Sequence, residues 1–349
     1  MQSPAQRGFR MPAEWEPQRA IWLAWPHHRA DWPGKFAPIP FVYGEIVRHL
    51  AAHVQVELLV RDAKQREQAQ GIFMAAGVDD RCVRFHEIAT NRIWLRDSGP
   101  TFISDGTEKA MLHWGFNGWA KYRNHRHDVS VPERMNEALK LERIVPMHKG
   151  RRVVLEGGGI EVNGKGCVMV TEEWLLDPSV QVRNAGFTRD DYEQVFADYL
   201  GAPHTIWLGH GIVGDDTHGH IDDLARFVNA DTVVIATTRD KTDANYDLLR
   251  DNARRLKRAT DAKGKPLNVV ELPMPKALLY EDFRLPASYA NFLIANGLVL
   301  VPTFNDPMDR VALSILAELM PKHAVVGIHC VDFVLGLGTL HCMSQQECV

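Results

Sequence analysis

The stretch Gly214-Asp215-Asp216-Thr217-His218-Gly219-His220-Ile221-Asp222-Asp223 runs directly into the short apolar segment 224–227. It is the clearest example of a pattern in this chain, in which ionisable side chains stand next to a short β-type run. Asp97 follows the run 92–95, and Glu156 follows the run 153–155. Cys342 lies at the end of a glycine-punctuated run, 335–340.

These junctions recur at a similar interval along the chain. Asp97 and Glu156 are 59 residues apart, and Glu156 and His220 are 64 apart. His220 and Cys342 are 122 residues apart, which is close to two intervals. Because a fixed period indicates repeated structural units, we predict four or five units around an axis, each sending one polar side chain to the centre.

Short strand-type runs alternate with longer segments whose apolar residues recur at helical spacing. The predicted strands are residues 20–25, 54–60, 92–95, 153–155, 167–171, 232–237 and 298–302. The predicted helices are residues 41–53, 62–76, 189–200, 243–260 and 309–319. This mixture predicts an α/β fold. Since no low-complexity linker divides the chain, we expect residues 1–349 to form one domain.

The composition is ordinary for a globular protein: 349 residues, 45% of them hydrophobic and 24% charged. A net charge of -4 and the lack of a long basic run argue against a nucleic-acid partner. Residues 1–17 lack the pattern of a signal peptide. No stretch approaches the roughly 18 apolar residues that cross a bilayer. We therefore expect a cytoplasmic protein without a membrane partner.

The chain has five cysteines and no Cys-x-x-Cys pair, which favours reduced thiols over a disulfide framework or a zinc knuckle. A cysteine thiolate is a good nucleophile, particularly when a histidine can assist it. The glycines before Cys342 and the polar residues after it indicate access, so Cys342 is the candidate nucleophile. Cys348 is expected to be a bystander.

Two of the carboxylates each have a functional and a structural interpretation. Asp97, in Trp94-Leu95-Arg96-Asp97-Ser98-Gly99-Pro100-Thr101, could clamp a planar cation through two parallel hydrogen bonds or simply form a turn. Glu156 precedes three glycines, where a backbone can approach a ligand closely. A plain turn is the alternative there, because a phosphate cradle would need a following Lys-Ser/Thr pair.

The segment around His220 is more specific. If it is a strand, His220 and Asp222 point to the same face, where an imidazole beside a carboxylate suits proton transfer at a cationic substrate. A metal site formed by His218, His220, Asp222 and perhaps His341 is one alternative. A structural hydrogen-bond cluster is the other.

Together these segments resemble the agmatine deiminases, within the wider family that includes the Porphyromonas-type peptidyl-arginine deiminases. The resemblance runs along nearly the whole chain. It is carried by Met11-Pro12-Ala13-Glu14-Trp15-Glu16-Pro17, Trp25-Pro26, residues 94–100, Phe116-Asn117-Gly118-Trp119 with Lys121-Tyr122, Glu156-Gly157-Gly158, Gly219-His220-Ile221-Asp222 and Leu340-His341-Cys342.

The resemblance implies a five-bladed α/β propeller (pentein) of ββαβ-type units, with the site on a pseudo-fivefold axis. It implies a triad of Cys342, His220 and Glu156, with Asp97 and Asp222 holding a guanidinium group. It also implies hydrolysis of agmatine without a cofactor or metal, on the route to putrescine, and by analogy a homodimer. Like-charge repulsion from three carboxylates should raise the pKa of the Cys342 thiol.

The chain departs from the agmatine deiminases at His218, where an acidic residue is usual, and at residues 173–176 and 336–340. The pocket for the substrate tail is therefore open to question. Trp94 and Trp119 are candidate walls, and Asp215 or Asp216 is a candidate acceptor for a tail ammonium. A free amino acid would need an arginine, and Arg96 is the one adjacent to a motif.

Three other functions stay open on the sequence alone. The first is a peptidyl-arginine or other guanidino-group deiminase. The second is a metal-dependent hydrolase, and the third is a non-catalytic propeller scaffold.

Overall fold

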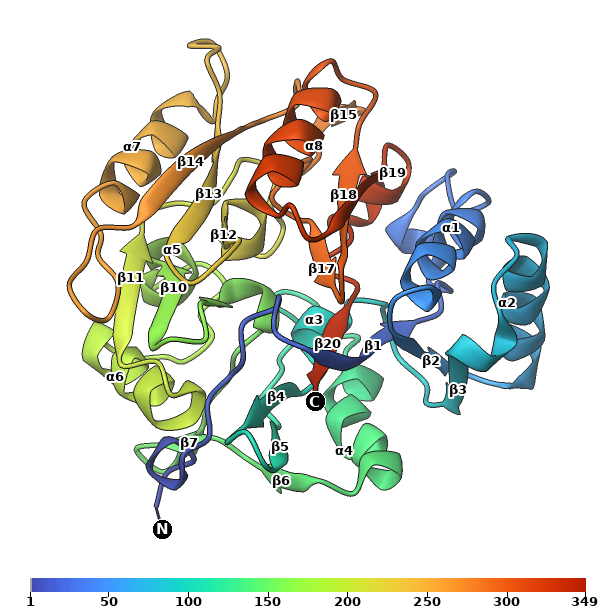
Figure 1. Ribbon diagram of the computed structural model, residues 1–349, viewed down its shortest axis with the longest axis horizontal. Coiled ribbons are helices and arrows are strands. Elements are labelled where there is room, and N and C mark those ends of the chain that lie inside the picture. The colour runs from blue at the N-terminus through green and yellow to red at the C-terminus, as the bar shows by residue number, and fades with distance from the viewer. Residues whose placement is uncertain (1) are drawn as a thin grey trace.

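The computed structural model describes residues 2–349 and contains five sheets, each of three or four strands, with two short hairpins between them (Figure 1). The three-stranded sheets are β4-β5-β6, β9-β10-β11, β12-β13-β14 and β17-β18-β19, and the four-stranded sheet is β20-β1-β2-β3. In all five, an antiparallel pair is followed by a parallel pair. The α/β class is therefore confirmed.

Each parallel pair is joined by a helical crossover, as parallel strands require. The units, in chain order, have these bounds: β4 (Thr101–Ser104), β5 (Lys109–Leu112), α4 (Arg126–Leu139) and β6 (Glu142–Ile144); β9 (Glu161–Val162), β10 (Cys167–Thr171), α5 (Glu172–Leu176), α6 (Arg189–Val195) and β11 (His204–Leu208); β12 (Ala225–Phe227), β13 (Thr232–Thr237), α7 (Tyr246–Leu256) and β14 (Asn268–Pro273); β17 (Leu293–Ala295), β18 (Leu298–Thr303), α8 (Met308–Leu319) and β19 (Ala324–His329).

The fifth unit combines the two ends of the chain. The C-terminal strand β20 (Gln345–Cys348) pairs antiparallel with β1 (Gln18–Ala24), and the two lie side by side in Figure 1. The unit continues through α1 (Ile39–Ala51), β2 (Gln55–Val60), α2 (Ala63–Ala75) and β3 (Val83–Glu87). The register places Gln18 opposite Cys348 and Trp22 opposite Gln345, so the segment that precedes β20 lies beside the end of β1.

The remaining elements are short. They are the one-turn helix α3 (Leu95–Ser98), the hairpins β7 (Met147–His148) with β8 (Arg151–Arg152) and β15 (Leu279–Tyr280) with β16 (Phe283–Arg284), and several single turns. No helix within residues 2–349 is long and apolar enough to cross a membrane. All five cysteines are free thiols in the described chain.

Most predicted elements are confirmed, because their apolar spacing matches the faces they bury. In α1, the buried side chains Ile39, Tyr43, Ile46, Val47 and Leu50 recur every three or four residues and form one stripe. Two predicted strands are wrong: residues 92–95 lead into α3, and residues 153–155 form only an isolated bridge from Val154 to Gly115. Both apolar runs are buried in turns instead.

The central strands carry the core, so truncation there should be costly. Leu300 in β18 has no exposed surface, and Leu300→Ala should lower the free energy of unfolding by about 2–5 kcal/mol. Leu279→Ala is the control, since Leu279 is 66% exposed and the change should stay within about 0.5 kcal/mol. Urea unfolding measures both; equal effects would contradict this account of the core.

Candidate active site

Side chains from three separate segments converge on one point beside Gly158. A Cβ atom added to Gly158 would lie 2.7 Å from Nδ1 of His220, 2.8 Å from Oδ1 of Asp97 and 3.0 Å from Oδ2 of Asp222. The Sγ of Cys342 lies 3.4 Å from that same Asp222 oxygen. The structure therefore brings together the residues whose spacing predicted a common centre, and a side chain at position 158 would fill the space between them.

Asp97 lies in α3, inside a short helical turn rather than after a strand. Its Oδ2 accepts a hydrogen bond from the indole of Trp119 at 2.8 Å, and its Oδ1 accepts one from the Gly158 amide at 3.0 Å. Burial, helped by the nearby carboxylates and opposed by His220, raises the pKa of Asp97 to about 6. Each oxygen keeps a second lone pair that a guanidinium could use.

The carboxylate of Glu156 points toward other protein side chains and not toward open space. Its carboxylate accepts hydrogen bonds from Arg183 Nε at 3.1 Å and from the Trp174 indole at 2.9 Å. Burial opposes the charged form, but Arg183 and His220 outweigh it and lower the pKa of Glu156 to about 2. The carboxylate is thus a permanent anion beside His220, and its partner Arg183 carried no recognisable sequence signal.

His220 is buried between two carboxylates. Its Nδ1 lies 3.8 Å from Asp97 and its Nε2 lies 3.7 Å from Glu156, while neither nitrogen has a hydrogen-bond partner among the described residues. Burial favours the neutral ring, but the charges of Asp97, Glu156 and Asp222 prevail and raise the pKa of His220 to about 9. The ring therefore carries a proton at neutral pH and is free to transfer it.

Asp222 uses its two oxygens differently. Oδ2 accepts from His341 Nδ1 at 2.8 Å and from the Cys342 thiol, whereas Oδ1 is buried and has no hydrogen-bond partner within residues 2–349. Burial disfavours its charge, but His341 and the other neighbouring cations keep the pKa of Asp222 below its usual value. Oδ1 can therefore accept a hydrogen bond from a cation.

Cys342 is a buried thiol among carboxylates. Burial is the largest cause that raises its pKa well above the ordinary value, followed by Asp222, Asp223 and Asp97. The predicted direction is confirmed, but Glu156 is not among the main causes, and burial outweighs repulsion. The amide of Asn291 donates to Sγ at 3.0 Å and partly offsets the increase.

His220 and Asp222 are not on a strand, contrary to the prediction. Ile221–Asp223 is a 3-10 turn, because Asp215 accepts from the backbone amides of Thr217, Gly219 and His220 and curls the chain there. Gly219 also has a φ of 99°, which suits glycine and interrupts an extended run. β12 begins only at Ala225.

All the assembled residues occupy turns just before the first strand of a unit. Asp97 precedes β4, Glu156 precedes β9, Asp222 precedes β12 and Cys342 precedes β20. Asn291 holds the same place before β17, 71 residues after His220 and 51 before Cys342. The sequence reasoning missed Asn291, although the double interval between His220 and Cys342 pointed to a unit there.

The predicted metal set does not come together. His218 Nε2 pairs with Asp177 at 3.0 Å, away from His220. Within residues 2–349, the two groups whose ligand atoms lie within 4.8 Å of one another are Glu14 with Glu161 and His341, and Asp222 with Asp223 and Cys342. The guanidinium of Arg226 bridges Glu14 and Glu161. Within the described residues, the ligand atoms of His218, His220 and Asp222 therefore do not form one such group.

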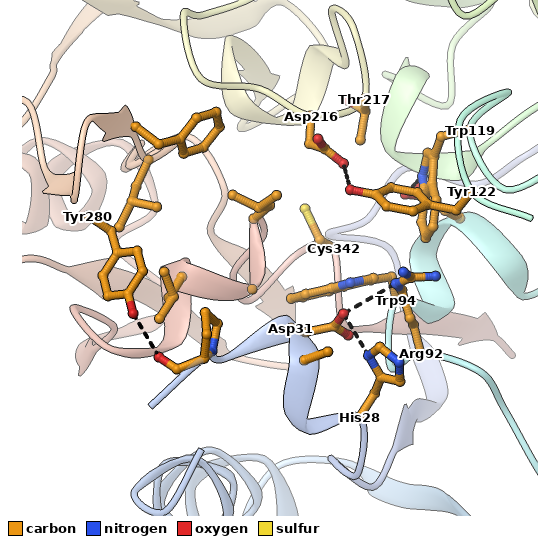
Figure 2. Close-up of a pocket in the computed structure, with 18 of the residues that line it drawn as sticks. His28, Asp31, Arg92, Trp94, Trp119, Tyr122, Asp216, Thr217, Tyr280 and Cys342 are labelled. Carbon is orange, nitrogen blue, oxygen red and sulfur yellow. Dashed lines mark hydrogen bonds and ion pairs between the residues drawn. The ribbon is translucent and has the colours of Figure 1, made fainter. Parts of the chain in front are cut away.

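Cys342 opens into a cavity of about 510 Å³ that Trp94, Trp119 and Asp216 also line (Figure 2). Asp97 is a further lining residue. The other lining residues are His28, Ala30, Asp31, Pro33, Arg92, Tyr122, Thr217, Tyr280, Glu281, Phe283, Leu285, Leu335, Gly336 and Leu337. Gly338 lets Trp94 approach Cys342, since a Cβ there would lie 3.0 Å from both. Both predicted tryptophan walls thus line the cavity, and Trp119 also holds Asp97.

The polar residues predicted to bind a substrate tail differ in their contacts and in whether they line the cavity. Asp216 lines the cavity, but it is ion-paired with Lys121 and accepts from the Tyr122 hydroxyl at 2.7 Å. Asp215 is engaged by backbone amides. Arg96 is buried, with its Nε directed at the carbonyl of His341, and it does not line the main cavity.

Comparison with known proteins identifies the family of this chain. The model of the Porphyromonas-type peptidyl-arginine deiminase family matches residues 10–348. The agmatine deiminase of Stutzerimonas stutzeri (strain A1501) is 34% identical over 369 residues, with 99% of this chain and 97% of that protein covered. The agmatine deiminase of Pseudomonas aeruginosa (strain LESB58) is 33% identical with the same coverage.

A solved structure of the agmatine deiminase of Enterococcus faecalis superimposes with a TM-score of 0.90 and 30% identity, over 99% of this chain and 98% of that one. The predicted resemblance is confirmed, and with it the class of hydrolases that act on the C–N bonds of amidines. The chain belongs to the Porphyromonas-type peptidyl-arginine deiminase family.

Proposed function

We propose that this protein is an agmatine deiminase, which hydrolyses the guanidinium group of agmatine to N-carbamoylputrescine and ammonia. The observation that carries the proposal is the pair of buried carboxylates, Asp97 and Asp222, whose oxygens lie 2.8 and 3.0 Å from one point beside Gly158, next to a thiol that opens into a cavity. A planar cation satisfies both carboxylates at once. The agmatine deiminases similar to this chain along their full length support the choice of substrate.

The proposed reaction begins with positioning. Asp97 and the unpartnered Oδ1 of Asp222 hold the guanidinium so that its central carbon faces Cys342. The thiolate forms a C–S bond, His220 gives its proton to one nitrogen, and that C–N bond breaks to release ammonia. The same histidine, now neutral, takes a proton from water. The resulting hydroxide attacks the carbon, and the C–S bond breaks to regenerate the thiolate. The added hydroxyl group loses its proton to solvent as it becomes the carbonyl of the ureido product.

The propeller architecture belongs to this proposal as well. The five sheets, each with an antiparallel and then a parallel pair, support five ββαβ-type blades around a pseudo-fivefold axis. One polar turn per unit supports a site on that axis. On this view residues 1–349 form a single domain.

The first test is ammonia release from agmatine, free arginine and a blocked arginine peptide. Wild-type protein should hydrolyse agmatine, and Cys342→Ala should lose activity by about 10⁴-fold or more. Cys82→Ala is the matched control, because Cys82 does not line the cavity, and it should retain activity. Turnover of the peptide in preference to agmatine would instead indicate a peptidyl-arginine deiminase. A fully active Cys342→Ala protein would contradict the mechanism.

The second test concerns the origin of the thiolate. Burial and three carboxylates raise the pKa of Cys342 in the free protein, so the thiol is protonated at neutral pH. A bound cation beside the same carboxylates stabilises the thiolate, and a non-reactive amidinium ligand should therefore lower this pKa. Ultraviolet absorbance of the thiolate measures it, with Cys342→Ala subtracted as the background. An unchanged pKa on binding would rule out substrate-assisted ionisation.

The third test concerns the tail ammonium, for which Asp216 is the proposed acceptor. Agmatine must compete with Lys121 for this carboxylate, and an exposed ion pair contributes only about 0–1 kcal/mol. Lys121→Met should therefore lower the KM for agmatine by about 2- to 5-fold, and Asp216→Asn should raise it. Butylguanidine, which lacks the ammonium, should respond to neither substitution. Parallel changes for both substrates would place the tail elsewhere.

A further inference from the structure

The N-terminal motif contacts the active site on the side away from the main cavity. Glu14, in Met11–Pro17, is buried, and its Oε1 accepts from the amide of Ile294 at 2.7 Å. Its Oε2 is ion-paired with Arg226 and lies 3.1 Å from Nε2 of His341. None of these contacts faces the main cavity, and the proposed reaction uses neither Glu14 nor His341.

His341 connects this motif to the clamp. It is buried, with Nε2 directed at Glu14 and Nδ1 at 2.8 Å from Oδ2 of Asp222. Because each ring nitrogen faces a carboxylate oxygen, each must carry a hydrogen for both contacts to be hydrogen bonds. A carboxylate, an imidazole and a second carboxylate thus form a continuous line from the N-terminal segment to the site.

This line determines which oxygen of Asp222 is left for a ligand. With Oδ2 engaged by His341 and the Cys342 thiol, Oδ1 is the oxygen without a donor. We infer that Glu14 and His341 are positioning residues, which orient Asp222, keep it ionised and hold its free oxygen toward the guanidinium. The inference rests on the proposed clamp and extends the functional unit to the N-terminal motif.

The contacts of Glu14 lead through His341 to Asp222, which distinguishes them from the contacts of a general structural ion network. Arg226 is fully buried and joins Glu14 to Glu161, with Nε 2.8 Å from Glu161, and it also donates to the carbonyls of Ala290 and Phe292. Glu161 is therefore as buried and as closely paired as Glu14, yet it makes no hydrogen bond to His341 or Asp222. The charged groups that face Asp222 are His341, His220, Arg226, Arg96, Asp223, Asp97 and Cys342.

The experiment compares His341→Ala, His341→Asn and Glu14→Gln with the matched control Glu161→Gln, by KM and kcat for agmatine from pH 6 to 9. Asp222 binds a cation only when ionised. Losing the donor makes Asp222 hold its proton more tightly, so KM should rise as pH falls and recover as pH rises. We expect His341→Ala to raise KM at pH 7 by about 10- to 100-fold, with a smaller change in kcat.

His341→Asn keeps an amide donor near the position of Nδ1 and should restore KM to within about 3-fold of wild type. Glu14→Gln should show the same pH trend more weakly. Glu161→Gln should lower the melting temperature and leave the pH dependence of KM unchanged. Lower melting temperatures with a wild-type KM profile in all four variants would overturn the inference, as would an identical shift from Glu161→Gln.

A second readout separates this inference from the substrate assignment. The acetamidinium ion offers the clamp an amidinium group without a tail, and calorimetry gives its Kd without turnover. If wild-type protein does not hydrolyse agmatine, the proposed function fails, while the variant-to-wild-type ratio of acetamidinium Kd still tests Glu14 and His341. If His341→Ala does not fold, the same measurements on His341→Asn and Glu14→Gln test the inference.

Discussion

Buried carboxylates around a single thiol are the constraint on which this structure depends. Asp97, Asp222 and Asp223 are all buried near Cys342, and Glu156 is buried beside His220. Unpaired buried charges are costly and tend to take up protons instead. The negative charges of these carboxylates are balanced to different degrees. Arg183 neutralises Glu156 and His341 supports Asp222, while the charge of Asp97 is only partly compensated. In the proposed reaction, a bound guanidinium supplies the remaining compensation.

The repeated unit explains how these groups come together. Every unit begins with a turn, then an antiparallel pair, and these turns supply Asp97, Glu156, Asp222, Asn291 and Cys342. A turn can direct a side chain away from its sheet without leaving backbone groups unpaired, because side chains such as Asp215 accept those amides. The sheets therefore provide rigidity, and the turns provide the chemistry.

The residues that hold the site residues in place were harder to predict from the sequence than the site residues themselves. Trp174 and Arg183 hold Glu156, Trp119 holds Asp97, and Asn291 contacts Cys342. Of these, only Trp119 was singled out in the sequence, as a cavity wall rather than a hydrogen-bond donor. Asn291 could have been found because the double interval between His220 and Cys342 pointed to a unit between them. Arg183 and Trp174 could not, since nothing in their local sequence distinguishes them from ordinary polar and core residues.

The sequence by itself determined the alternation of strands and helices, the roughly regular spacing of polar junctions and the candidate nucleophile, because periodicity and residue chemistry are local properties. Only the tertiary structure decided that His220 and Asp222 lie in a turn, that Glu156 faces Arg183, and that Asp216 is paired with Lys121. It also decided that Glu14 reaches His341, 327 residues later in the chain. Burial and charge compensation depend on neighbours brought together from distant units, and no local pattern records which neighbours those are.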